Sequence, residues 1–150
     1  MHAVDLATLE LRGVVSELDP QRRLGVAFPH HCSTGAASTA TVYFELEPGM
    51  HVGSHTDSAE ELLLILEGDA EATVGDERGY ASAGTMVVVP AMEPHNVLNV
   101  GTGPLRVLGF FSSSTVVATF ETPPVPDGPQ VFVIGAPIPV QLALGDPVPA

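Results

Sequence analysis

Short apolar runs separated by turn residues dominate the sequence between residues 41 and 111. Four of them are TVYFEL, ELLLILE, TMVVVP and PLRVLGFF, each about four to eight residues long, as is usual for strands. Gly, Pro, Asn or Asp bounds each run, and Gly75-Asp76 and Gly101-Thr102-Gly103 are expected to form hairpin turns. No long amphipathic helix interrupts the series, which argues against a parallel sheet built from β–α–β units. The pattern predicts an all-β sandwich or barrel.

The domain organisation follows from the same pattern. The chain has 150 residues, a size that usually forms one domain. We expect residues 41–120 to form the barrel core and residues 1–40 to supply peripheral strands and a loop that pack on it. Residues 121–150 carry most of the proline, spaced too closely for a regular sheet interior. Because this segment is also apolar, we expect an extended tail over the barrel or a neighbouring subunit; a disordered tail is the alternative.

Charge and composition exclude several classes of protein. The net charge is -13, from 18 acidic and 5 basic residues, and no basic cluster offsets it. Such a surface repels phosphate backbones, so we expect no nucleic-acid partner. Apolar residues make up 45% of the chain and mean hydropathy is +0.28, which argues against a disordered protein.

The expected location is the cytoplasm. The N-terminal residues lack a basic leader followed by an apolar core, and no run of about 18 apolar residues occurs, so we expect no membrane partner. Cys32 is the only cysteine, which excludes an intrachain disulfide and agrees with a reducing compartment. A lone cysteine is more often a packing residue than a nucleophile.

Four residues form a candidate metal site. Side chains two apart on a strand share a face, so His55 and Asp57 can point together into a barrel. Glu61 follows a short turn, and His95 begins a later run. Two imidazoles and two carboxylates suit a divalent transition metal; we favour iron or manganese, with zinc, nickel and copper also compatible. Asp57 and Glu61 are also the candidate catalytic residues, since either can accept a proton.

Three other histidines are weaker candidates. His51 shares the strand parity of His55, but four residues of extended chain span roughly 13 Å, too far for one ion. We therefore expect His51 to contribute polarity at a pocket rim. His30 and His31 are adjacent, so at most one can face a site, and both are expected to be loop residues.

The spacing of these residues resembles the two conserved motifs of the cupin superfamily. The first motif has a glycine, His-x-His, a glutamate and a closing glycine; the second has a glycine, Pro-x-Gly, a histidine and an asparagine. The resemblance covers about residues 41–111. The matching residues are Gly49, His55, Asp57, Glu61 and Gly68, followed by Gly84, Pro90, Met92, His95 and Asn99.

The resemblance implies a double-stranded β-helix barrel of the jelly-roll kind, with His55, Glu61 and His95 as metal ligands. Two positions depart from the pattern, because Asp57 replaces a histidine and Met92 replaces a glycine. Aspartate can bind the metal directly, act through water or serve as a base. A barrel of this family that has lost its metal is the alternative.

The expected function is a metal-dependent enzyme, most simply a dioxygenase-type oxidoreductase, acting on a small, partly apolar molecule. A redox-neutral isomerase, lyase or cyclase and a non-enzymatic binding protein are the alternatives. The run from Leu62 to Leu66 is apolar on both faces, so one face needs a second sheet or a partner subunit, and we expect a homodimer. Arg78 and Arg106 could bind a substrate carboxylate, although charged side chains are more often solvated.

Overall fold

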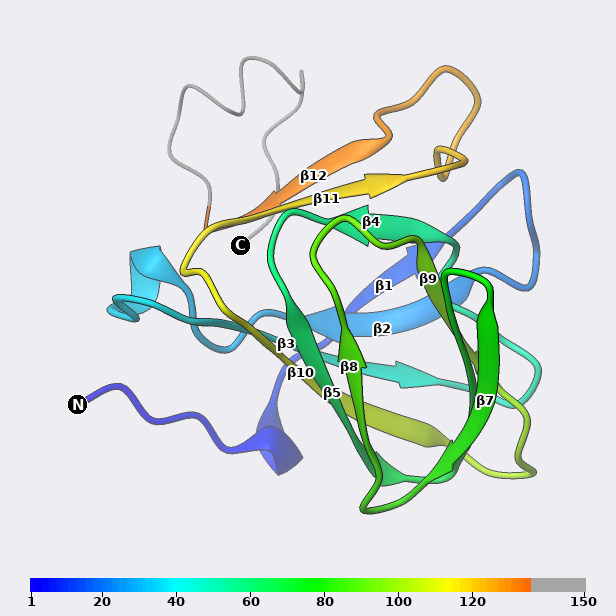
Figure 1. The fold of residues 1–150 in the computed structure, drawn as a ribbon, viewed down its shortest axis with the longest axis horizontal. Helices are drawn as coiled ribbons and strands as arrows, with labels where there is room; N and C mark the ends of the chain where they lie inside the picture. The colour runs from blue at the N-terminus through cyan, green and yellow to red at the C-terminus, as the bar shows by residue number, and fades with distance from the viewer. Residues whose placement is uncertain (136–150) are drawn as a thin grey trace.

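The computed structural model describes residues 1–135, which form an almost entirely β-stranded structure (Figure 1). Twelve strands lie in this range, together with two 3₁₀ turns, η1 (Leu6–Thr8) and η2 (Cys32–Thr34). No helix in the described range is long and apolar enough to span a bilayer.

The strands form two antiparallel six-stranded sheets. The first sheet contains, in spatial order, β1 (Arg12–Val15), β2 (Arg23–Ala27), β3 (Ala40–Leu46), β10 (Leu105–Phe111), β5 (Glu61–Glu67) and β8 (Met86–Val89). The second sheet contains β12 (Val131–Ile134), β11 (Val116–Phe120), β4 (His55–Asp57), β9 (His95–Asn99), β6 (Asp69–Val74) and β7 (Glu77–Ser82).

The core lies between the two sheets because each strand buries alternate side chains. On β5, Leu63 and Ile65 are buried, whereas Leu62 and Leu64 on the opposite face are only half-buried. The second sheet contributes Val97 and other buried residues to the same apolar cluster. Burial of this apolar surface holds the sheets together. The prediction of an all-β jelly-roll barrel is confirmed.

One of the two predicted hairpin turns is present. Gly75 and Asp76 connect β6 to β7, and the φ of Gly75 is +57°, a value that glycine adopts readily. Residues 101–103 instead connect β9 to β10, which lie in different sheets, so the predicted hairpin at this position is wrong. Asn99 holds this connection: its side-chain amide donates to the carbonyls of Leu46 and Gly103. The local sequence signals a turn but not a change of sheet.

The N-terminal and C-terminal segments extend the sheets. Strands β1 and β2 continue the first sheet next to β3, and β12 pairs with β11 at an edge of the second sheet (Figure 1). The tail is described only through residue 135. Residues 136–150 lie outside the described residues, so the extended course predicted for them stays a prediction.

Met92 occupies the motif position where a glycine was expected, and its backbone explains that expectation. Its φ is +64°, in the left-handed region, and its amide donates to the carbonyl of Asp57 at 2.8 Å. The side chain is exposed, so the methionine is not held by packing. A glycine would adopt this conformation without a Cβ penalty.

Two motif glycines give a matched test of the backbone. Gly68 and Gly84 have φ of +91° and +89°, but a Cβ at Gly68 would lie 2.6 Å from the carbonyl oxygen of Pro104, whereas one at Gly84 meets nothing within 4 Å. We expect Gly84→Ala to cost about 1–2 kcal/mol for the left-handed backbone alone, and Gly68→Ala to cost clearly more. Urea denaturation of both variants measures the difference, and equal losses would contradict this account of Gly68.

Candidate metal centre

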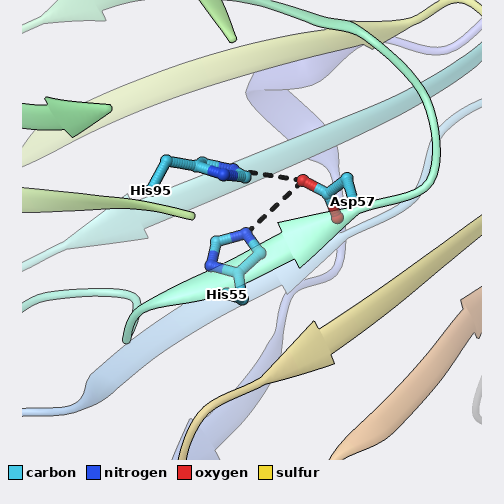
Figure 2. Close-up of side chains that lie close together, drawn as sticks. All are labelled: His55, Asp57 and His95. Carbon is cyan, nitrogen blue, oxygen red and sulfur yellow. Dashed lines mark ion pairs between the residues drawn. The ribbon is translucent and has the colours of Figure 1, made fainter. Parts of the chain in front are cut away.

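Two neighbouring strands of the second sheet bring the predicted site together. Strand β4 lies between β11 and β9, and its His55 pairs directly across the ladder with His95, the first residue of β9. The two imidazole rings are 4.1 Å apart between centroids. Asp57, two residues after His55, points to the same side of β4 (Figure 2).

The three side chains converge on one point (Figure 2). The Nε2 atoms of His95 and His55 lie 3.1 Å and 3.6 Å from Oδ2 of Asp57. One ligand atom from each residue lies within 4.8 Å of the other two, close enough for all three to hold one metal ion. Asp57 and His95 are only 3% and 2% exposed.

Backbone carbonyls fix the protonation of both imidazoles. Nδ1 of His55 lies 2.7 Å from the carbonyl oxygen of Gly53, and Nδ1 of His95 lies 2.9 Å from that of Glu93. A carbonyl oxygen only accepts, so each Nδ1 is the donor. In the neutral imidazoles the lone pair is therefore on Nε2, directed at Asp57. Metal-binding histidines are oriented in this way.

The buried polar atoms at the centre have no hydrogen-bond partner in the described residues. Oδ2 of Asp57 and Nε2 of His95 are close, but their geometry is not that of a hydrogen bond, and neither atom has another partner. When His95 is neutral, its Nε2 and Oδ2 of Asp57 are two acceptors that face each other in a buried place, and they repel unless a proton or a metal ion lies between them. The donor set and the unpartnered atoms therefore fit a divalent metal ion.

Glu61 lies next to this group without being part of it. Its Oε1 is 3.7 Å from Nε2 of His95, and the residue is 4% exposed. Gly109 makes room for the carboxylate, since a Cβ there would lie 2.7 Å from Oε2 of Glu61. Burial raises the pKa of Glu61, and the negative charge of Asp57 raises it further. The predicted ligation by Glu61 stays a prediction.

The two histidines differ in charge in the metal-free protein. Burial, with help from the charge on His95, lowers the pKa of His55 to about 4. Burial also acts to lower the pKa of His95, but the adjacent carboxylates of Asp57 and Glu61 outweigh it and raise the pKa to about 10. His95 thus holds a proton where a metal would bind, and His55 is already neutral.

The remaining histidines lie elsewhere. Nε2 of His51 is 2.7 Å from Oδ2 of Asp19, and its Nδ1 faces the amide of Asn96 at 3.2 Å. The side chain of His31 caps η2. His30 contacts His2. None of these belongs to the group of three in the described part of the chain.

The site opens into an apolar cavity of about 240 Å³. Two residues of its wall were not predicted from the sequence. Phe120 of β11 stacks on His55, with 4.6 Å between ring centroids. The guanidinium of Arg22 lies over the ring of Phe120, with its central carbon 4.3 Å from the ring centroid. No local pattern marks either residue, because each reaches the site through long-range pairing. Other lining residues include Val26, Phe44, Leu63, Val97, Phe111 and Phe132.

The comparison with protein families agrees with this architecture. Residues 42–111 match the family model for the cupin domain. These residues form a cupin domain. The matched range contains His55, Asp57, Glu61 and His95, while β1, β2, β11 and β12 lie outside it. No curated protein matches the chain at a significant level.

Solved structures share the fold at low sequence identity. The Cnp3 cupin domain of Schizosaccharomyces pombe has a TM-score of 0.61 and 18% identity, with 74% of this chain and 73% of that chain covered. The polyketide cyclase RemF from Streptomyces resistomycificus has a TM-score of 0.60 and 18% identity, with 74% and 78% covered.

A third similar structure concerns the Mn(II) centres of Bacillus subtilis oxalate decarboxylase. It has a TM-score of 0.58 and 23% identity, with 66% of this chain covered. The match spans only 28% of that longer chain. At such identities the likeness shows the fold alone.

Removal of one imidazole tests the metal centre. We expect protein purified without a histidine tag to bind one divalent metal ion, and His95→Ala to lose it, because two ligand atoms do not hold the ion tightly. His51→Ala is the matched control and should keep the metal, since His51 pairs with Asp19 instead. Elemental analysis by mass spectrometry measures both, and metal retained by His95→Ala would contradict the assignment.

Metal binding should release a proton. The pKa of His95 is about 10 in the metal-free protein, above its ordinary value of 6.5, so at pH 8 the imidazolium must lose its proton to become a ligand. Apparent affinity should therefore rise by about tenfold per pH unit from neutral pH up to the pKa of His95 and then level off. Calorimetry in buffers of different ionisation enthalpy counts the protons, and a count of zero at pH 8 would contradict the raised pKa.

Proposed function

We propose that the protein is a metal-dependent enzyme that acts on a small, partly apolar organic molecule. The observation that carries the proposal is the convergence of three side chains with unpartnered buried atoms at the wall of an apolar cavity. Cavities of this kind, apolar with a few convergent polar groups, are the usual form of small-molecule sites.

Each residue has a role in this proposal. His55, Asp57 and His95 would hold the metal, with Glu61 as a fourth ligand or as a base. A divalent transition metal, when bound, polarises a substrate oxygen and, if redox-active, supports chemistry with dioxygen. The stacking of Phe120 on His55 and the apolar wall exclude water from the ligands.

Glu61 is suited to proton transfer. Its buried carboxylate lies 3.7 Å from Nε2 of His95, and burial raises its pKa above the ordinary value. A carboxylate with a raised pKa is a stronger base than an exposed one, which suits it to accept a proton from a bound molecule. Because a Cβ at position 109 would lie 2.7 Å from Oε2, Gly109 leaves room for this carboxylate.

The favoured reaction is a dioxygenase-type oxidation. Two imidazoles and one carboxylate on one side of an ion leave open positions, an arrangement associated with non-haem iron oxygenases. A redox-neutral isomerase, lyase or cyclase reaction is the second candidate, favoured by the proton-transfer position of Glu61 and by the likeness in fold to a polyketide cyclase. A binding protein without activity is the third.

We also propose that the protein is a homodimer that pairs through the outer face of the first sheet. Leu62 of β5 pairs with Phe110 of β10 on one side and Val88 of β8 on the other, and Leu64 pairs with Met86. Residues paired in this way share a face. The side chains of Met86, Val88 and Phe110 are exposed, which leaves an apolar surface for a second copy.

Oxygen consumption separates the candidate reactions. We expect protein loaded with iron or manganese to consume oxygen with at least one member of a panel of phenolic and dicarbonyl compounds, and His95→Ala to consume none. An oxygen electrode with parallel product analysis measures this. Product formation without oxygen uptake would favour the redox-neutral reaction over the dioxygenase, and bound metal with neither readout on any compound would contradict an enzyme for these substrates.

A further inference from the structure

Arg22 is a buried cation in the wall of the metal-site cavity. It is 4% exposed, although it carries a charge at every physiological pH. Its Nε donates to the carbonyl of Val52 at 3.0 Å, and an Nη donates to the carbonyl of Thr122 at 2.6 Å. The remaining N–H groups have no protein partner within residues 1–135, and the side chain lines the cavity.

The position of Arg22 is closely determined. Its guanidinium lies over Phe120, which stacks on the metal-site residue His55, so Arg22 is one aromatic ring away from His55. It also packs on Gly53, where a Cβ would lie 2.7 Å from Nε. The guanidinium of Arg22 is therefore fixed in position before a ligand binds, which lowers the entropy cost of binding.

Within the described residues no carboxylate lies at ion-pair distance from Arg22; burial lowers the pKa of its guanidinium, and the negative charge of Asp19, acting from farther away, offsets this only in part. The protein has 18 acidic residues, yet none forms an ion pair with Arg22 there, and Asp19 pairs with His51 instead. Arg78 and Arg106, the two arginines that the sequence offered for a substrate carboxylate, both pair with glutamates. A buried cation without a counter-ion in direct contact is costly, so an anion that binds beside it gains the compensating attraction.

We propose that the cavity binds an organic monocarboxylate, with the carboxylate on the free N–H groups of Arg22 and the apolar body against the cavity wall beside the metal site. A guanidinium presents two parallel donors that match the two oxygens of a carboxylate. A single buried cation balances one negative charge; outside the metal-site group most of the lining residues are apolar, and the second arginine among them, Arg12, is exposed. A phosphate dianion would need more donors than this wall provides.

The inference rests on the proposed function in one respect, because the metal site gives the bound molecule its reacting end. The carboxylate site itself does not need the metal. The carboxylate site is therefore tested on metal-free protein, so that the result does not depend on whether the proposed metal centre is correct.

Benzoate and benzamide give a matched pair of probes, since they differ in charge but not in shape. We expect metal-free protein to bind benzoate about tenfold or more tightly than benzamide, as charge-assisted hydrogen bonds predict. Titration calorimetry at pH 7.5, with ligand-observed NMR for weak binding, measures both affinities. Equal affinities, or no binding of benzoate, would overturn the proposal.

Four variants test which arginine provides the charge. Arg22→Gln should remove the preference for benzoate while leaving benzamide affinity within about twofold, and Arg22→Lys should restore part of the preference, because lysine keeps the charge but not the planar fork. Arg106→Gln is the matched control and should keep the full preference. If Arg22→Gln kept the preference for benzoate, or if Arg12→Gln at the exposed end of the cavity alone removed it, the assignment to Arg22 would be wrong.

Discussion

The antiparallel pairing of β4 with β9 sets the geometry on which the candidate metal site depends. It places His55 opposite His95, and the alternation along β4 adds Asp57 on the same side. The result is a cluster of acceptors in a water-poor interior, which is unfavourable until a cation neutralises it. In the metal-free protein the proton on His95 serves this purpose. Folding of the barrel and binding of a cation are thus linked through one pair of strands.

Much of the fold and part of the site could be predicted from local patterns. Strand-length apolar runs between turn residues gave the all-β class, because strand alternation and turn chemistry are local properties. The period of two also placed His55 and Asp57 on one face. The left-handed backbone of Met92 shows why the motif has a glycine there: the geometry is kept although the residue that suits it best is absent.

The prediction that was wrong and the residues that the sequence did not reveal depend on long-range contacts. A turn signal at residues 101–103 does not reveal whether the next strand stays in the same sheet, since that choice depends on which strands pair. The four candidate ligands came from spacing and family resemblance, but whether Glu61 lies at ligand distance depends on how β5 packs against β9. Arg22 could not be found, because its carbonyl partners, Val52 and Thr122, are far away in the sequence.

The cavity draws its wall from two kinds of sequence. The candidate metal ligands lie within residues 42–111, the range that matches the family model. Arg22, Phe120 and Phe132 lie in segments before and after this range. Under the proposed function, the residues that determine reactivity and those that determine selectivity therefore lie in different parts of the chain. In an enzyme of the proposed kind, changes in the flanking strands can alter which molecule binds while the ligand geometry stays intact, so two proteins with the same motifs need not share a substrate.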